Sequence, residues 1–544
     1  MLIGLLLFGC TNKVSPETDI QFCSGSRKVM YDPLHPSEMW SFPDDFYTKP
    51  DNDSPTGRVV DLSEAKAPWT TNLSPLFADS INEMSTRSGF ARLGSVVIRF
   101  TGPVSAGPLS AEESLSSTDI MWYDTSVSPP ERVAFSVITS EFQNQLILKP
   151  IKPLRANAEQ TIVVSTDFTD IDGNCIAPAD VIKDIIRGTA TEPYLDKQEQ
   201  TQVAIDKLGL ERSNISHILT YTTHDDLQVF SNIAQSIPDQ DYHWDTDITC
   251  DDGNPIHCER SFIANDYLDD GALSDSEIHN QWSIPVQTWL PKDLEPPYPT
   301  IIYGHGLNSR AQEATGFASR MSELGVAVVA IDAMRHGQHP SAETNATLPA
   351  LDFLGLNLSN FQFDARGLRG NFDQSALDRL QLLALLKQDG DLDGDGTLDV
   401  ETDNILYYGV SLGGLMGPHI LANSDIGAGV LFVAGGDLPV FTTDTTTIEG
   451  LDSLLQELIG PPDVFNRMIP LMQTSVDSAD PAVWGAHVLH NRFNGHPAPD
   501  LLFPVCLTDD TVPPATAKAL AHGLGLPQMT PVLDVKCARL LVHL

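Results

Sequence analysis

The stretch Tyr407–Gly417, YYGVSLGGLMG, decides how the second half of the chain folds. The apolar residues before Ser411 are typical of a buried strand, and the small residues after it are typical of a helix start. The serine lies between them in the pattern Gly-x-Ser-x-Gly. Such a turn lifts a serine hydroxyl to the carboxyl end of a sheet, where it is open to attack a substrate. Ser411 is therefore the candidate nucleophile.

The surrounding sequence, from about residue 279 onward, alternates apolar strands with helices. The predicted strands are SIPVQTWLP, PTIIYGHG, VAVVAID, NILYYGV, GVLFVAGG, LFPVCLT and TPVLDV. Helical spacing is found in AQEATGFASRMSELG and again over residues 373–387. Continuous apolar strands separated by helices predict a mostly parallel sheet that is covered on both faces.

Together these features make residues 279–544 resemble an α/β-hydrolase. The segment His305-Gly306-Leu307 follows a strand, as the oxyanion loop does in that family. The resemblance implies acyl transfer to Ser411, with the backbone N–H groups of Leu307 and Leu412 holding the oxyanion. The insertion at about residues 437–500 is expected to form a cap. Its apolar residues either line an acyl pocket or pack onto the core.

The catalytic acid should follow a late strand of the sheet. In LFPVCLTDDTVPP, Asp509 matches the Asp-x-x-Val-Pro pattern of the family, with Asp510 as its close rival. Asp437, which follows LFVAGG, is a further alternative, although a turn residue is the favoured interpretation there. The resemblance thus implies Asp509 as the residue that orients the base.

The base should be a histidine beyond the final strand, and only His522 and His543 follow Asp509. His522 is predicted near the end of a helix, and His487, His490 and His496 precede the acid. Two interpretations stay open. Either His543 is the base, or the chain end is truncated or altered and the true histidine is lost. A base at a frayed terminus is poorly held, which favours the second.

An acidic loop, DGDLDGDGTLDVETD, precedes the strand that carries Ser411. Calcium prefers oxygen ligands at alternating positions of such a loop, with a glycine at the turn. The candidate ligands are Asp391, Asp393, Asp395, the carbonyl of Thr397, Asp399 and Asp403. We expect a structural Ca²⁺ and no organic cofactor. The alternative is a solvated acidic loop.

The amino-terminal half predicts a separate β domain. Residues 11–60 are rich in Pro, Ser, Asp and Thr and are expected to form a tether and wrapping segment. Short apolar runs with turns between them predict an antiparallel β-sandwich over 61–190, and residues 191–278 are expected to form a mixed connector. The segments FPDDFYTKPDNDSPTGRVVDL and SGFARLGSVVIRFTGPVS are similar to the start of bacterial virulence-factor-type lipases.

The chain begins with the apolar run MLIGLLLFG, which is too short to span a bilayer and is followed by Cys10. It resembles a lipoprotein signal over residues 1–10, which implies lipidation of Cys10 and an outer-membrane anchor in the bacterial cell envelope. The alternative is a buried strand. Cys250 and Cys258 flank a turn-rich loop and are the pair expected to form a disulfide.

The net charge of −41 excludes nucleic acid as an expected partner. The sequence therefore predicts a membrane-anchored serine ester hydrolase, a carboxylesterase or lipase acting on an ester or lipid substrate. One alternative is a non-catalytic surface lipoprotein with a degenerate or truncated hydrolase domain. A second is a serine peptidase, since one fold serves several reactions.

Overall fold

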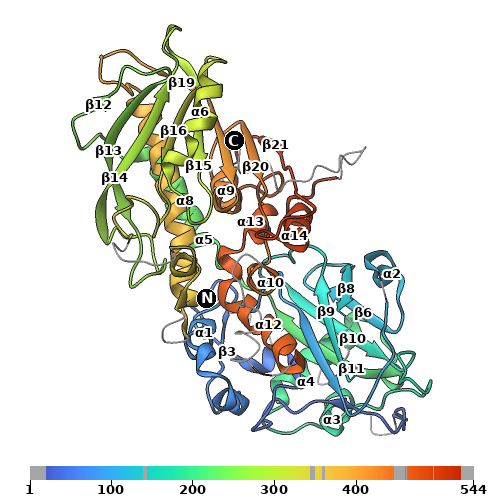
Figure 1. Cartoon of the computed structure of the whole chain (residues 1–544). Helices are drawn as coiled ribbons and strands as arrows, with labels where there is room; N and C mark the ends of the chain where they lie inside the picture. Colours follow the sequence, from blue (N-terminus) through green and yellow to red (C-terminus); the bar gives the residue numbers. More distant parts are fainter. Residues whose placement is uncertain are drawn as a thin grey trace, which may run out of the picture.

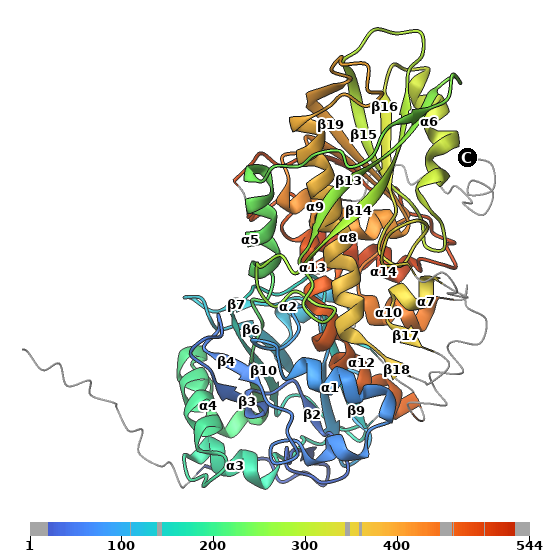
Figure 2. The same ribbon diagram turned by 90° about the vertical axis from the view of Figure 1, so that its left-hand side faces the viewer.

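The structure is a computed structural model, shown in two views in Figures 1 and 2. It describes residues 20–108, 110–138, 144–342, 349–357, 362–445, 460, 462–493 and 495–527. Two of the predicted functional residues, Cys10 and His543, lie outside these ranges, as does the strand predicted at TPVLDV. Within them no helix is both long and apolar enough to cross a bilayer.

The amino-terminal domain is a sandwich of two antiparallel sheets. One sheet contains β1 (Val29–Met30), β2 (Ser41–Phe42), β5 (Val96–Phe100), β8 (Phe135–Ile138) and β9 (Gln145–Pro150). The other contains β6 (Ile120–Asp124), β7 (Glu131–Arg132), β10 (Glu159–Ser165) and β11 (Ile215–Thr222). Ile98 of the first sheet and Trp122 of the second belong to one buried cluster, so the core lies between the sheets.

The sandwich extends beyond the range predicted for it, 61–190. Strands β1 and β2 come from the segment predicted as a tether, and β11 comes from the predicted connector. The apolar faces of α3 (Asp180–Arg187) and α4 (Leu195–Leu208) cover the second sheet, because Ile185 and Ile205 are buried with Val163 and Ile218. The predicted domain limits are therefore corrected at both ends.

The second domain is built on an eight-stranded sheet. Its order is β12 (Thr249–Cys250), β13 (Ile256–Asp266), β14 (Asn280–Leu290), β16 (Ala327–Ile331), β15 (Tyr298–Gly304), β19 (Val400–Val410), β20 (Ala428–Phe432) and β21 (Asp500–Leu502). The strands β16, β15, β19, β20 and β21 run parallel to one another. The pairs β12–β13, β13–β14 and β14–β16 are antiparallel. Because β12 and β13 belong to this sheet, its start at residue 279 was predicted too late.

Cys250 and Cys258 pair across β12 and β13 and form the expected disulfide. A second disulfide joins Cys23 to Cys175 and fixes the start of the described chain to the sandwich. Cys506 is buried and free.

Helices cover both faces of the parallel strands, as the sequence predicted (Figure 2). Ile301 and Tyr303 of β15 face Ala318 of α6 (Thr315–Ser322). Ile302 of the same strand faces the opposite side, where α8 (Ala365–Gln388) and α9 (Leu412–Asn423) lie. This alternation follows from the two-residue period of a strand, and both faces are apolar because both are covered.

The insertion after β20 lies between the two domains (Figure 1). It contains α10 (Leu438–Asp444), α12 (Pro462–Val476) and α13 (Pro481–Gly485). Met468, Leu471 and Met472 of α12 enter the main core, and α12 contacts α8, β5 and α1 (Ala78–Met84). These residues therefore pack onto the core, while the predicted cap over the site stays a prediction because 446–459 are not described.

The remaining strands and α-helices connect or flank these parts. They are β3 (Thr48–Pro50), β4 (Arg58–Val60), α2 (Ala111–Ser116), α5 (Gln228–Ser236), α7 (Pro349–Phe353), β17 (Leu356–Asn357), β18 (Gln362–Phe363) and α14 (Pro514–Leu524).

Candidate active site

Ser411 occupies the sharp turn between β19 and α9. Its φ of 50° and ψ of −111° fall in a region that side-chain-bearing residues rarely adopt. Such a conformation costs on the order of 1–3 kcal/mol and persists only where the surrounding structure holds it. Ser411 is half-buried, and its N–H donates to Phe432 of the neighbouring strand β20. The strain therefore lies at the predicted nucleophile.

The two glycines of the Gly-x-Ser-x-Gly pattern have a steric role. A Cβ at Gly413 would overlap the backbone of Gly304, and a Cβ at Gly409 would overlap the backbone of Gly413. Strands β15 and β19 and the start of α9 therefore approach more closely than any side chain allows. This close packing lets the chain reverse within a few residues and holds Ser411 at the carboxyl end of the sheet.

The predicted oxyanion loop lies beside Ser411. A Cβ placed on Gly306 would be 3.7 Å from the Cβ of Ser411. The N–H of Gly413 donates to the carbonyl of His305 at 2.9 Å, which fastens the loop to the first turn of α9. Within the described ranges, the N–H groups of Leu307 and Leu412 donate to no acceptor. Both are therefore free to bind a ligand oxygen.

Two side chains hold the amides on either side of Leu307. The Gly306 N–H donates to Oε2 of Glu313 at 3.0 Å, and the Asn308 N–H donates to Nε2 of His336 at 3.4 Å. Glu313 also accepts the hydroxyl of Tyr303 at 3.2 Å. Sequence patterns assigned neither residue a role at this loop, because only the fold brings their side chains to the amides.

His305 supports the loop through two hydrogen bonds and does not act as a catalytic base. Its Nε2 accepts the Ala333 N–H at 2.9 Å, so the ring proton is on Nδ1, which lies 2.8 Å from the Gly306 carbonyl. Burial holds the pKa of His305 well below its usual range, and His336 lowers it further. The imidazole therefore stays neutral and serves as a fixed hydrogen-bonding link.

The predicted acid, Asp509, follows β21 at the same edge of the sheet as Ser411. Its Oδ1 accepts the N–H groups of Thr511 and Val512, each at 2.8 Å. The preceding segment lies against β20, because the Val433 N–H donates to the Pro504 carbonyl. The two backbone contacts fix one carboxylate oxygen of Asp509, and no described residue donates to Oδ2.

The alternative acid, Asp437, has a different partner. Its carboxylate forms an ion pair with Lys149 of β9, in the amino-terminal domain. Its N–H donates to Asp480 at 2.9 Å, and it immediately precedes α10 with a φ of 62°. Burial raises the pKa of Asp437 against the pull of Lys149. This residue therefore joins the two domains.

The histidines that precede the chain end are held elsewhere. His522 lies in the last turn of α14, as predicted, with Nδ1 3.0 Å from the Ile151 carbonyl. His487 lies 3.3 Å from a guanidinium nitrogen of Arg92 and stacks on Phe493. His543, the predicted base, is not described.

The acidic loop brings three of its predicted ligands together. Carboxylate oxygens of Asp391, Asp393 and Asp395 lie within 4.8 Å of one another. Asp399 and Asp403 lie outside this group: Asp399 accepts the Leu392 N–H at 2.7 Å, and Asp403 is in β19. Burial raises the pKa of Asp393, and its two acidic neighbours raise it further. Clustered carboxylates of this kind fit a hard cation with oxygen ligands.

Comparison with known proteins gave matches among solved structures only, since no protein-family model and no curated protein matches the sequence. Acetyl xylan esterase 1 from Thermoanaerobacterium sp. JW/SL YS485 is 18% identical, with a TM-score of 0.37, over 55% of this chain and 84% of that one. An acetyl xylan esterase from Paenibacillus sp. R4 is 15% identical, with a TM-score of 0.39, over 56% and 85%. A cold-adapted esterase from an Arctic intertidal metagenomic library is 14% identical, with a TM-score of 0.28, over 52% and 85%.

The strand order of the second domain defines its fold. Parallel strands in the order β16-β15-β19-β20-β21 carry helices on both faces, and the strained turn at Ser411 follows the central strand β19. The second domain therefore has the α/β-hydrolase fold.

Proposed function

We propose that this protein is a serine ester hydrolase with Ser411 as its nucleophile. The observation that carries the proposal is the strained turn at Ser411 beside two unengaged backbone N–H groups. Backbone strain is retained where a function requires it, and free amides beside a nucleophile can stabilise an oxyanion. Within this fold, the substrate class proposed is a carboxylic ester, as in carboxylesterases and lipases.

In the proposed mechanism, Ser411 Oγ attacks the acyl carbonyl and gives its proton to a base. The carbonyl oxygen becomes an oxyanion, which accepts hydrogen bonds from the N–H groups of Leu307 and Leu412. Collapse of this intermediate breaks the ester bond, and the alcohol leaves with the proton. Water then attacks the acyl-enzyme, and the acid product leaves as Ser411 regains its proton. Each oxyanion donor is expected to contribute about 2.7–4 kcal/mol.

We propose His543 as the base and Asp509 as the residue that orients it. Support comes from Asp509, which lies beyond β21 at the correct edge of the sheet and whose Oδ2 no described residue engages. The variant His543→Ala should then lose esterase turnover by at least about 10³-fold. His490→Ala is the matched control, because His490 is exposed. Equal activity in both variants would remove His543 from the mechanism.

A bound calcium ion is proposed for the loop of Asp391, Asp393 and Asp395. It would be held by carboxylate oxygens that otherwise repel one another, and its role would be to stabilise the segment leading into β19.

We also propose anchoring in the cell envelope through a lipid on Cys10, on the basis of the signal-like sequence alone.

The experiment for the main proposal is a comparison of the parent and Ser411→Ala on p-nitrophenyl acetate and p-nitrophenyl butyrate. The parent should hydrolyse at least one ester, and the variant should not, while both keep the same melting temperature. A peptide p-nitroanilide serves as the control substrate. If Ser411→Ala kept full esterase activity, the assignment would be wrong, and cleavage of the peptide alone would favour the peptidase.

A further inference from the structure

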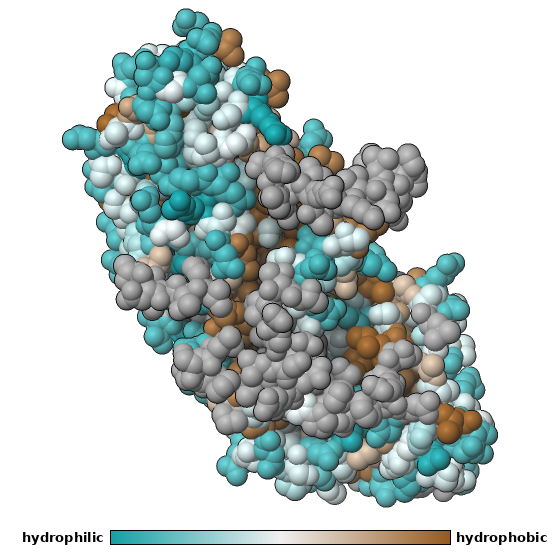
Figure 3. Space-filling model, in the orientation of Figure 1, coloured by the Kyte–Doolittle hydropathy of each residue, from teal (hydrophilic) through white to brown (hydrophobic). Residues whose placement is uncertain are grey.

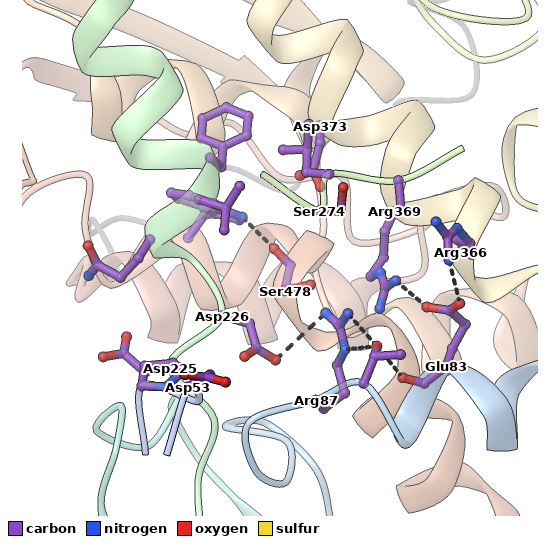
Figure 4. A pocket seen from close by; sticks show the side chains of 18 residues that line it. Asp53, Glu83, Arg87, Asp225, Asp226, Ser274, Arg366, Arg369, Asp373 and Ser478 are labelled. Carbon is purple, nitrogen blue, oxygen red and sulfur yellow. Dashed lines mark hydrogen bonds and ion pairs between the residues drawn. The ribbon is translucent and has the colours of Figure 1, made fainter. Parts of the chain in front are cut away.

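A cavity lies at the junction of the two domains, and no residue of the candidate active site lines it (Figure 4). Its volume is about 520 Å³, within the range of small-molecule sites. Its walls come from the end of α1, the start of α5, the 272–274 loop and the amino-terminal half of α8.

Ion pairs form two sides of the cavity. Glu83 of α1 contacts Arg369 at 2.5 Å and Arg366 at 3.5 Å, both on α8, so this cluster joins the domains. On another side, Arg87 lies 3.6 Å from Asp226. Figure 4 shows Glu83 with the α8 arginines on one side, and Asp225, Asp226 and Asp53 on the other. The cavity therefore presents both signs of charge.

One buried carboxylate oxygen in this cavity lacks a partner within the described part of the chain. Asp373 is 8% exposed, and its Oδ1 has no partner among the described residues. In Figure 4, Asp373 faces Ser274 across the upper part of the cavity. Oδ2 of Asp226 makes no hydrogen bond to a described residue, but it is the atom that faces Arg87 at 3.6 Å in the ion pair. An unpartnered buried acceptor costs about 1–3 kcal/mol, so Oδ1 of Asp373 gains from a ligand that supplies a donor.

The arginines leave donors available. A guanidinium has five N–H groups, and Arg369 uses one to the Ser475 carbonyl and another to Glu83. Arg87 directs two nitrogens at Thr86. A ligand in the cavity thus meets the free acceptor of Asp373 and the remaining arginine donors together. Hydroxyl groups both donate and accept, so a ligand that carries several of them can engage both kinds of group at once.

An apolar wall completes the cavity. Val229, Phe230, Leu273 and Trp484 line it, and Nε1 of Trp484 already donates to the Ser478 carbonyl. A surface of this kind suits the C–H face of a sugar ring, while the polar sides suit its hydroxyls.

We infer that this interdomain cavity binds a small neutral polyhydroxylated ligand, a saccharide unit, through Asp373. The site is separate from Ser411, so the inference goes beyond the proposed ester hydrolysis and does not depend on it. A ligand there would contact both domains at once, and its binding would strengthen their junction.

The test is isothermal titration calorimetry on the full chain with D-glucose, D-xylose and D-galactose, and with spermidine and inorganic phosphate as charged comparators. We expect saturable binding of at least one sugar and none of the comparators. The variant Asp373→Leu removes both acceptor oxygens and should weaken sugar binding at least tenfold. Asp373→Asn keeps one acceptor oxygen and should lose less.

The matched control is Asp389→Asn, an exposed residue at the carboxyl end of the same helix, which should bind like the parent. Melting temperatures at pH 8 check folding, and neither Asp373 variant should fall below the parent there, since each removes a buried carboxylate whose Oδ1 accepts no hydrogen bond from a described residue. Binding of spermidine or phosphate in place of sugar would overturn the inference. So would sugar binding that Asp373→Leu leaves unchanged, or no binding of any of the three sugars.

Discussion

Gly306 and Glu313 are joined by a hydrogen bond of 3.0 Å, in which the backbone N–H of the glycine donates to Oε2 of the carboxylate. His336 accepts the N–H of Asn308 in the same way, two residues along the loop. The amide between them, that of Leu307, is left free next to Ser411. The loop is thus fixed by its flanking amides, and its central amide is kept for the proposed oxyanion.

Replacing Glu313 should therefore lower turnover without removing the nucleophile. In Glu313→Ala the Gly306 N–H loses its acceptor and the loop shifts, so kcat should fall by about tenfold or more while KM changes less. In Glu313→Gln the amide oxygen can still accept, so kcat should recover most of the parent value. Steady-state kinetics on p-nitrophenyl butyrate measures both. Equal losses in the two variants would mean that the negative charge matters, and not the hydrogen bond.

Local sequence signals predicted the central part of the fold. The turn at Ser411 was predictable because the close approach of β15, β19 and α9 admits only glycine at positions 409 and 413, and these two glycines stand at a fixed spacing around the serine. The disulfide between Cys250 and Cys258 was predictable for a similar reason, since the two cysteines flank one turn.

Contacts between residues far apart in the chain were not predictable. The ion pair between Lys149 and Asp437 and the bond from Gly306 to Glu313 depend on how the elements pack, which no short pattern encodes. The same holds for β11 and β13, because no short pattern in the predicted connector says which sheet a strand joins. Domain limits therefore failed where strands of the predicted connector were shared between the two domains.

Removal of calcium should destabilise the second domain. If an ion sits among Asp391, Asp393 and Asp395, chelation with EDTA should lower the melting temperature by several degrees, and added CaCl₂ should restore it. Differential scanning calorimetry measures the shift, and elemental analysis of the purified protein measures the metal. The variant Asp395→Asn should show a smaller response to EDTA. An identical melting curve with and without EDTA, with no metal bound, would dismiss the ion.

The stability of the protein should depend on Asp373 between about pH 4 and pH 7. Burial raises the pKa of Asp373 from 3.8 to about 7, against the pull of Arg369 and Arg87. Between these values the folded state holds a proton that the unfolded chain has released, so this residue's contribution to stability falls as pH rises through about 7. In Asp373→Asn no proton is involved.

The advantage of Asp373→Asn over the parent should therefore be larger at pH 8 than at pH 5. Urea denaturation of both proteins at the two pH values measures the difference. An advantage that stays constant from pH 5 to pH 8 would show that Asp373 titrates near its usual value.

The central claim, that Ser411 is an activated nucleophile, is tested most directly by covalent labelling. The full chain and its Ser411→Ala variant are treated with a fluorophosphonate probe, and intact mass is measured for each. We expect one added probe mass on the parent and none on the variant, with both proteins folded by circular dichroism. A folded parent that takes up no label, or a variant that is labelled equally, would contradict the assignment of Ser411.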